Sequence, residues 1–263
     1  MPNLLAFDTS SDNCSVSIYH DSHYESSSLA APRKHTQLIL PMIEALMKEH
    51  GCALNDIDAI GFGCGPGSFT GIRIAAGVAQ GLGFGLDSSV YPISNLEALA
   101  LQGCKDKGIT TPCLVLAAID ARMDEVYWSV CLVNIASQQI VKTLVGESVG
   151  KPESICLSGH DLPELDLSSE ALSVLGINLE NSANPYDKIS LLGVGSGFDF
   201  LERFPEEVKQ KINTFDSQTR PHAQAICELT KAAWEINQSP KLSDAVPSYV
   251  RDTVTWKKLP GRE

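Results

Sequence analysis

The chain contains a pattern of apolar runs and glycines that occurs twice, in the same order. Leu4-Leu5-Ala6-Phe7-Asp8 is an apolar run that ends on an aspartate, and it is matched by Val115-Leu116-Ala117-Ala118-Ile119-Asp120. Farther along, Ile60-Gly61-Phe62-Gly63-Cys64-Gly65 is matched by Leu192-Gly193-Val194-Gly195-Ser196-Gly197. Two matches in the same order indicate a duplicated unit, with a longer insert in the second copy. The chain is therefore expected to fold as two similar halves.

The duplication predicts an α/β chain of two mixed-sheet domains with helices packed on them. We expect the first domain at residues 1–107, joined by a late helix at 221–237, and the second at 108–220, followed by a C-terminal tail at 238–263. A length of 263 residues accommodates two domains of ordinary size.

The first half predicts a small meander and then a helix. Residues 14–19 alternate apolar and small polar side chains, as a half-buried strand does, and a third strand is expected around Tyr24–Leu29. Apolar residues then recur at helical spacing over His35–His50. Pro41 lies inside that pattern, so it is expected either to kink the helix or to mark its effective start.

The remaining elements follow from the same periodicities. Ile57–Phe62 predicts a buried strand, Ile72–Leu86 a second helix, and Glu125–Val133 a strand of the second half. Pro221–Asn237 predicts a late helix with proline at its first position, and we expect it to cross back onto the first half. Leu162–Pro185 is expected to be variable surface structure.

Composition argues against a protein that binds nucleic acid or membranes by itself. Lys and Arg number 20 against 32 Asp and Glu, so the formal net charge of -12 disfavours a chain that binds nucleic acid or an anionic membrane by itself. No apolar run approaches the roughly 20 residues that span a bilayer. The eight cysteines form no CxxC pair, and the first residues lack the basic start of a signal peptide. We therefore expect reduced thiols and a cytoplasmic protein.

The two strand-ending aspartates, Asp8 and Asp120, are candidates for binding metal or phosphate. Tandem hairpins of this kind resemble the actin, Hsp70 and sugar-kinase ATPases, in which phosphates lie between two hairpin turns. The turn Thr9-Ser10-Ser11 is small enough to approach a phosphate, whereas Ala121-Arg122-Met123 is too bulky. The alternative is a turn-capping carboxylate. That alternative is favoured for Asp120 and evenly balanced for Asp8.

A glycine-rich loop that follows a strand and opens a helix is the strongest local signal. Its N–H groups and the helix dipole are suited to an anion, although the Lys-Ser/Thr pair of a P-loop is missing. The alternative is a tight strand-to-helix turn that needs glycine for its backbone angles. The candidate residues for binding a nucleotide or anion are Asp8, Thr9, Gly65, Gly67, Ser68, Gly71 and Arg73.

The helix after this loop carries Gly77, Gly81 and Gly85 at four-residue steps. Each glycine in a helix costs roughly 0.8–1 kcal/mol relative to alanine, so a close neighbour is expected along this stripe. That neighbour is the chain's own sheet, its helix at 35–50, or a helix of another subunit, and periodicity leaves the three open. The paired histidines His20 and His23 fit a solvated turn better than a surface metal site.

Five segments of the chain form a recognisable series of motifs: Leu5–Ser10, His35–Ile43, Gly65–Arg73 (GPGSFTGIR), Asp120–Trp128 (DARMDEVYW) and Pro247–Arg251 (PSYVR). In order and spacing these segments resemble the TsaB (YeaZ) family. The resemblance is strongest over the first half and weak over Val149–Lys188. It implies the duplicated actin-like (ASKHA, RNase H-like) fold.

The resemblance also implies an accessory subunit without catalytic residues. Family members pair with TsaD, the enzyme that modifies adenosine beside the tRNA anticodon, and an ATPase, TsaE, completes the complex with nucleotide. We therefore expect a TsaD heterodimer, a homodimer in isolation as an alternative, and only indirect tRNA contact. The implied pairing residues lie on two helices: Leu38, Met42, Leu46, Ile74, Gly77, Val78, Gly81 and Gly85.

The same resemblance implies that no metal is held. Asn95 and Leu99 stand where the related TsaD enzyme has two metal-binding histidines, and a leucine side chain has no ligand atom. No cofactor is expected, with a nucleotide at the subunit junction as the alternative. Two enzyme hypotheses compete with this one: an actin-fold ATPase or kinase that uses Asp8 and the glycine loop, and a metalloprotease.

Overall fold

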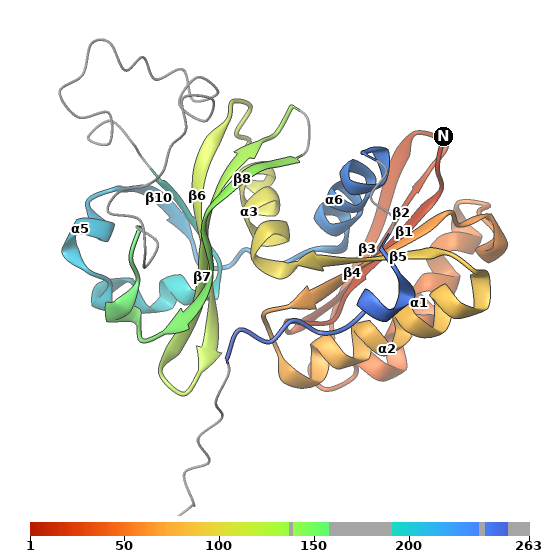
Figure 1. The fold of residues 1–263 in the computed structure, drawn as a ribbon, viewed down its shortest axis with the longest axis horizontal. Helices are drawn as coiled ribbons and strands as arrows, with labels where there is room; N and C mark the ends of the chain where they lie inside the picture. Colours follow the sequence, from red (N-terminus) through yellow and green to blue (C-terminus); the bar gives the residue numbers. More distant parts are fainter. Residues whose placement is uncertain (137–138, 158–190, 237–239, 252–263) are drawn as a thin grey trace, which may run out of the picture.

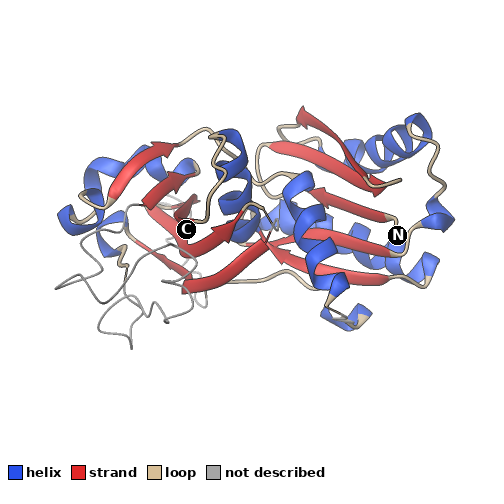
Figure 2. Ribbon diagram, turned by 90° about the horizontal axis from the view of Figure 1, so that it is seen from above, coloured by secondary structure: helices blue, strands red, loops and turns tan. Residues whose placement is uncertain are grey.

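A computed structural model describes residues 1–136, 139–157, 191–236 and 240–251 of the chain. Two five-stranded sheets stand side by side, and two helices lie between them (Figure 1). Figure 2 shows the same two sheets from above, each with helices packed on it. The expected surface segment Leu162–Pro185 lies outside the described residues.

The first sheet has the strand order β3-β2-β1-β4-β5. β1 pairs antiparallel with β2 and parallel with β4, and β4 pairs parallel with β5. The strands are β1 (Leu4–Asp8), β2 (Asn13–His20), β3 (His23–Ala30), β4 (Ala59–Gly65) and β5 (Ser89–Ser94).

The second sheet repeats this arrangement, with the order β10-β9-β6-β7-β8. β6 pairs antiparallel with β7 and parallel with β9, and β9 pairs parallel with β10. β6 therefore corresponds to β1, and β9 to β4, which confirms the predicted duplication. The strands are β6 (Cys113–Arg122), β7 (Glu125–Asn134), β8 (Gln139–Gly150), β9 (Leu191–Val194) and β10 (Ile212–Asp216).

The helices form an outer layer on the first sheet and a shared layer between the sheets (Figure 1). α1 (His35–Glu49) and α2 (Phe69–Leu86) form the outer layer. α3 (Asn95–Asp106) follows β5 but also packs on β6 and β7, whereas α6 (Ala223–Glu235) follows β10 and packs on β1 and β4. The short helices are η1 (Leu54–Asp56), η2 (Pro152–Ser154), η5 (Ser196–Arg203), α5 (Glu206–Lys209) and η6 (Leu242–Asp244).

Strand alternation decides which core each residue enters. Leu4 and Ala6 of β1 face the layer between the sheets, where they join Leu99 of α3 and Ile226 of α6. Leu5 and Phe7, which point to the other side of the same strand, face α1 and α2 instead. The first sheet is thus covered by apolar contacts on both faces, as the continuous apolar run at its centre predicts.

α1 begins at His35, as the sequence predicts, and Pro41 does not mark its start, because Gln37 and Leu38 already donate to the Lys34 carbonyl and complete a turn before it. Two other helix starts differ from the sequence prediction. α2 begins at Phe69 rather than Ile72, because Ser68 is its N-cap. α6 begins at Ala223, so Pro221 precedes the helix instead of occupying its first position.

Candidate functional site

Asp8 ends β1 and is completely buried. Its Oδ2 accepts a hydrogen bond of 3.2 Å from the backbone N–H of Ser10, so the carboxyl caps its own turn. Burial raises the pKa of this carboxyl to about 7, and the hydrogen bonds from Ser10 and Thr9 oppose that rise only partly. Its other oxygen, Oδ1, has no hydrogen-bond partner among the described residues.

Asn95, the first residue of α3, places a second unpartnered oxygen beside Asp8. A Cβ atom built on Gly63 would lie 2.3 Å from Oδ1 of Asp8 and 2.4 Å from Oδ1 of Asn95, so both oxygens converge over this glycine. The Asn95 amide nitrogen donates to the Pro66 carbonyl at 3.2 Å, which leaves its oxygen facing the carboxyl. When the Asp8 carboxyl is protonated, its O–H is a donor of the kind that this oxygen lacks.

The glycine-rich loop packs its backbone directly against the first turn. A Cβ on Gly71 would lie 2.0 Å from the Thr9 carbonyl oxygen, and one on Gly67 would lie 2.9 Å from Cβ of Ser10. The Ser68 N–H donates to the Ser10 carbonyl at 2.8 Å. These contacts account for both glycines without a ligand. They favour the interpretation of the loop as a tight strand-to-helix turn.

The predicted anion-binding residues are therefore not gathered around one open cradle. Asp8 and Thr9 are completely buried, and the Thr9 hydroxyl donates to the Gly71 carbonyl at 2.7 Å. Ser68 caps α2, since its Oγ accepts a hydrogen bond from the Gly71 N–H at 3.3 Å. Arg73 instead lies at the surface, where its guanidinium is 3.2 Å from the centre of the Phe69 ring.

A segment near the end of the described chain runs across both halves. It contains the PSYVR motif, whose role the sequence did not indicate. We name residues 245–251 the C-terminal strap. The Ser248 N–H donates to the Cys64 carbonyl at 2.8 Å, and Gly65, at a φ of 130°, leaves room for the Ser248 carbonyl oxygen. Arg251 pairs with Glu125 of β7. The strap thus joins the end of β4 to the second hairpin (Figure 1).

The second hairpin turn, between β6 and β7, has an unusual backbone conformation. Arg122, Met123 and Asp124 all adopt positive φ angles, of 64°, 56° and 66°. Asp120 accepts a 2.8 Å hydrogen bond from the Arg122 N–H and pairs with the Arg122 guanidinium at 3.1 Å. Asp120 is a turn-capping carboxylate in this structure, as the favoured interpretation held.

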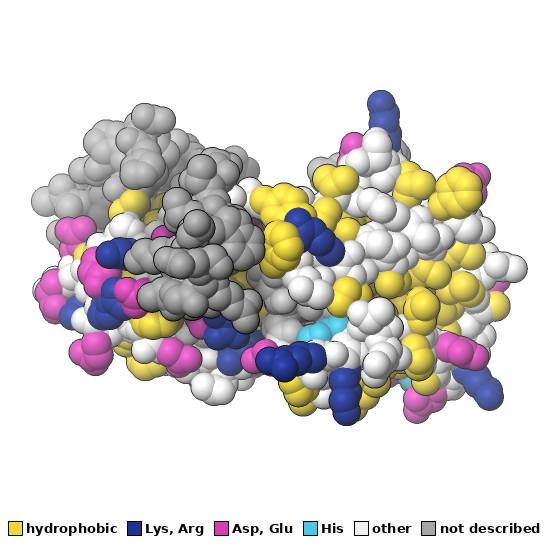
Figure 3. Space-filling model, turned by 90° about the horizontal axis from the view of Figure 1, so that it is seen from below, with side chains coloured by type: hydrophobic (Ala, Val, Ile, Leu, Met, Phe, Trp, Pro, Cys, Tyr) yellow, Lys and Arg dark blue, Asp and Glu magenta, His cyan; other side chains and the backbone are white. Residues whose placement is uncertain are grey.

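Three exposed glycines leave one face of α2 flat. A Cβ on Gly77, Gly81 or Gly85 would meet no atom within 4 Å, so neither the chain's sheet nor α1 covers this stripe. The neighbouring Phe84 side chain is 81% exposed. Figure 3 shows hydrophobic side chains gathered over the half of the molecule that carries α1 and α2.

The other predicted pairing residues divide into two groups. Leu38 of α1 and both Ile74 and Val78 of α2 are half-buried, with part of each side chain at the surface. Met42 and Leu46 are only 6% and 4% exposed, because they point from α1 into the core below the helices. They support this face from beneath and contribute little of its surface.

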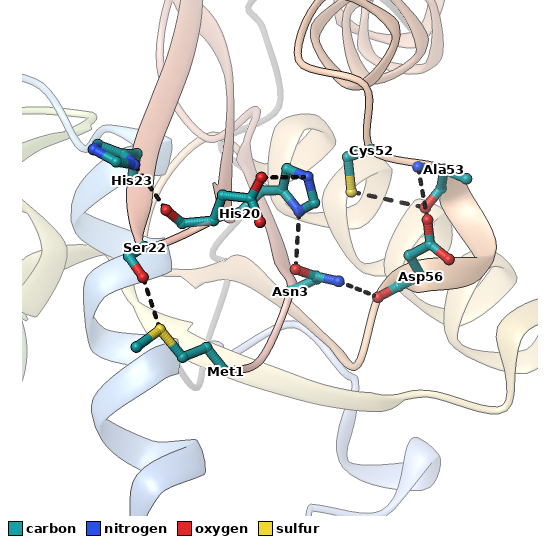
Figure 4. Close-up of polar contacts among 9 residues, drawn as sticks. Met1, Asn3, His20, Ser22, His23, Cys52, Ala53 and Asp56 are labelled. Atoms are coloured by element: carbon teal, nitrogen blue, oxygen red, sulfur yellow. Dashed lines mark hydrogen bonds and ion pairs between the residues drawn. The ribbon is translucent and has the colours of Figure 1, made fainter.

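The paired histidines His20 and His23 have separate hydrogen-bond partners. His20 bonds to the Asn3 side chain at 2.9 Å, whereas His23 bonds to the Asp21 carbonyl at 2.8 Å, so the two rings have separate partners (Figure 4). Leu99 is completely buried in the core between the sheets. Within the described ranges, no three His, Cys, Asp or Glu side chains are grouped as metal ligands.

One polar cavity of about 240 Å³ lies where α3 and the approach to α6 meet. Its lining includes Asn13, Gln102, Asp106, Arg220 and His222. Burial lowers the pKa of His222, so a neutral ring is favoured. The sequence patterns did not indicate this cavity, because its lining comes from segments that are far apart in the chain. In the described part of the chain, no helix is both long and apolar enough to cross a membrane.

Two five-stranded units of the same order, each contributing a helix to the sheet of the other, define a duplicated actin-like α/β fold. A family model described as "TsaD: tRNA N6-adenosine threonylcarbamoyltransferase" matches residues 28–259. The solved structure of YeaZ from Pseudomonas aeruginosa is similar, with a TM-score of 0.77 and 35% identity, over 95% of this chain and 100% of that one.

Two curated relatives match almost end to end. The tRNA threonylcarbamoyladenosine biosynthesis protein TsaB of Haemophilus influenzae is 36% identical over 99% of this chain and 98% of its own length. TsaB of Escherichia coli is 33% identical over 99% of each. The chain belongs to the TsaB family of tRNA threonylcarbamoyladenosine biosynthesis proteins, and it falls within the family that the TsaD model describes. The resemblance drawn from the motifs is confirmed.

Proposed function

We propose that this chain is a non-catalytic subunit that docks TsaD through the exposed face of α1 and α2 and keeps that enzyme active. The observation that carries the proposal is the uncovered stripe of Gly77, Gly81 and Gly85. Each exposed helix glycine costs roughly 0.8–1 kcal/mol, and no contact within the described chain offsets that cost. A flat stripe lets a partner helix approach closely.

The chemistry beside the stripe fits a helix of another protein. Ile74 and Val78 border the glycines, and Phe84 is exposed at the far end of the same helix. A mixture of small residues and exposed apolar side chains is suited to close helix packing. Because the chain itself matches the TsaD family model, the two proteins share a fold, and their corresponding helices can pair about an approximate twofold axis.

Three features support a role without catalysis. The Asp8 carboxyl is buried and caps its own turn, the glycine loop closes on that turn, and Leu99 supplies no metal ligand. An ATPase or kinase would need an accessible carboxylate and phosphate-binding loop, so these contacts argue against that alternative. A metalloprotease would need metal-binding side chains at positions 95 and 99. This chain has an amide side chain at Asn95 and a hydrocarbon side chain at Leu99.

The wider complex follows the same proposal. TsaE is the expected third protein, with nucleotide at the subunit junction, and the partners make the main tRNA contacts. The net charge of -12 supports that division, because an acidic chain repels a polyanion. A homodimer through the same face is the expected competing state of the isolated chain.

Titration of TsaD with the wild-type chain and with Gly81→Leu tests the proposal. Wild type is expected to form a heterodimer at micromolar concentration in calorimetry and size-exclusion chromatography. The leucine fits its own chain, since nothing lies within 4 Å of the new Cβ, but it blocks a closely packed helix. We expect Kd to rise at least about thirtyfold, equivalent to about 2 kcal/mol.

Gly146→Leu is the matched control, because Gly146 is an exposed glycine of β8 that also has open space around it. Its affinity for TsaD is expected to equal that of wild type. Circular dichroism and thermal unfolding establish that both variants are folded. Absence of a heterodimer with wild type, or unchanged affinity in Gly81→Leu, would overturn the assigned docking face.

A further inference from the structure

Two cysteines on neighbouring elements bring their sulfur atoms unusually close. Cys104 lies in the last turns of α3, and Cys113 is the first residue of β6. Their Sγ atoms are 3.2 Å apart. Both thiols are free in the structure.

Backbone hydrogen bonds in the short connection between α3 and β6 hold the two cysteines close together. The Ile109 N–H donates to the Cys104 carbonyl at 2.9 Å, and the Gly108 N–H donates to the Lys105 carbonyl at 3.0 Å. At the other end, Cys113 is anchored in the sheet opposite Val133. The two cysteines therefore face each other from fixed backbone positions.

The surroundings give the two thiols different access to solvent. Cys104 is completely buried in the core between the sheets, whereas Cys113 is half-buried at the end of its strand. The hydrogen bond between the two sulfurs lowers the pKa of the Cys113 thiol. The same hydrogen bond, together with burial, raises the pKa of Cys104. Cys113 is accordingly the more reactive thiol, and Cys104 is positioned to react with it after Cys113 has been oxidised.

We propose that Cys104 and Cys113 form an oxidation site that takes a peroxide and closes to a disulfide. A disulfide bond is about 2.05 Å long, so the two sulfurs need to approach by only about 1 Å. A closed bond would tie the end of α3 to the start of β6, at the connection between the two halves of the fold. The site lies on elements other than α1 and α2, and it is independent of the docking proposal.

The reaction with hydrogen peroxide balances in two steps. The Cys113 thiolate attacks one peroxide oxygen, the O–O bond breaks, and a sulfenic acid forms while the leaving hydroxide takes a proton to give water. The Cys104 sulfur then attacks the Cys113 sulfur and the S–O bond breaks. The second hydroxide takes the Cys104 proton and leaves as water. Two thiols lose two electrons in total, and one peroxide becomes two waters.

Peptide mapping of the full chain tests this site. The reduced protein is treated with hydrogen peroxide, its remaining thiols are blocked with iodoacetamide, and it is digested with trypsin without reductant. Cleavage after Lys105 and Lys107 separates the two cysteines, so the expected product is the peptide Ile74–Lys105 joined to Gly108–Arg122. Each of these peptides contains a single cysteine, which makes the assignment unambiguous. Dithiothreitol is expected to restore both separate peptides.

Two alanine variants, each shown to be folded by circular dichroism, sharpen the test. Cys113→Ala is expected to leave Cys104 as a free thiol after peroxide, because its sulfur is buried. Cys131→Ala is the matched control, since Cys131 is a buried cysteine of the same core, and the joined peptides should persist. Recovery of both cysteines as alkylated thiols in wild type, or of Cys113 as sulfinic acid without the joined peptide, would overturn the proposal.

Discussion

At the scale of single residues, Asp8 shows how burial changes what a carboxyl does. In sequence it resembles a phosphate- or metal-binding aspartate at a strand end. In the structure it is enclosed by Gly63 of β4 and by Asn95, and its pKa is raised to about 7. A protonated carboxyl is a hydrogen-bond donor, and Asn95 presents it with an unpartnered oxygen. The residue therefore fits a structural role within the fold.

The raised pKa of Asp8 predicts a stability that falls with rising pH. The folded state keeps a proton that the unfolded chain, with an ordinary pKa of 3.8, has already lost. This contribution is complete below the unfolded pKa, is lost as pH rises towards about 7, and is constant above that value. In Asp8→Asn the amide donates to Asn95 at every pH. We expect it to be more stable than wild type at pH 8 by on the order of 1–3 kcal/mol in urea unfolding.

Asp12→Asn serves as the control, because Asp12 is an exposed carboxyl of the same turn. Its unfolding free energy should follow the wild-type pH profile. If Asp8→Asn retained the wild-type fall in stability between pH 5 and pH 8, that fall would have to come from a group other than Asp8.

At the scale of elements, α2 has two faces that contain glycine for different reasons. Gly83 lies where a Cβ would be 2.3 Å from Cγ2 of Val90 and 3.0 Å from Cδ1 of Leu242. Gly81, on the opposite face, has open space. The helix thus needs Gly83 to pack on its own chain, whereas Gly81 has no role in the described fold. Sequence spacing groups the glycines together, and only their neighbours separate them.

Alanine substitutions at these two positions are expected to change stability in opposite directions. Gly81→Ala should stabilise the chain by roughly 0.8–1 kcal/mol, the helix-propensity difference. Gly83→Ala should destabilise it by about 1–3 kcal/mol, because the new methyl group overpacks against the buried Val90. Urea unfolding of the two variants beside wild type measures both values. Destabilisation by Gly81→Ala would mean that the chain's own fold requires that glycine.

At the scale of the whole molecule, the two halves interlock through their crossing helices. α3 packs on the second sheet and α6 on the first, and the C-terminal strap adds a second connection. Between α3 and α6, Lys105 pairs with Glu228, whose side chain is completely buried. Gln224 also donates to that carboxylate, at 3.1 Å. The halves therefore share a core and a partly buried ion pair.

Removal of one partner of this ion pair is expected to weaken the whole fold. Lys105→Met leaves the buried Glu228 carboxylate without its cation, and such changes cost about 3–5 kcal/mol. Guanidinium unfolding should show that loss. The double variant Lys105→Met/Glu228→Gln, which buries no charge, should recover most of it. A small effect of Lys105→Met alone would contradict the expected contribution of this ion pair.

Much of the fold was predictable because its signals are local. Alternation in β2, helical spacing in α1 and the repeated apolar runs depend only on neighbouring residues, and each predicted the element that forms. Of the candidate site, Asp120 is a turn cap, as the favoured interpretation held. The inward orientation of Met42 and Leu46 was not predictable, because spacing defines an apolar stripe without saying where the core beneath it ends.

By itself the sequence determined the duplication, the order of the strands and helices in the first half as far as α2, and the family, because repeated patterns and specific motifs are properties of the chain in one dimension. Only the tertiary structure decided that Asp8 is closed off, that the strap crosses both halves, and that the Gly77–Gly85 stripe is left open. The physical reason is that burial depends on contacts between distant segments. Asp8, Gly63 and Asn95 enclose one another only after β1, β4 and α3 have come together.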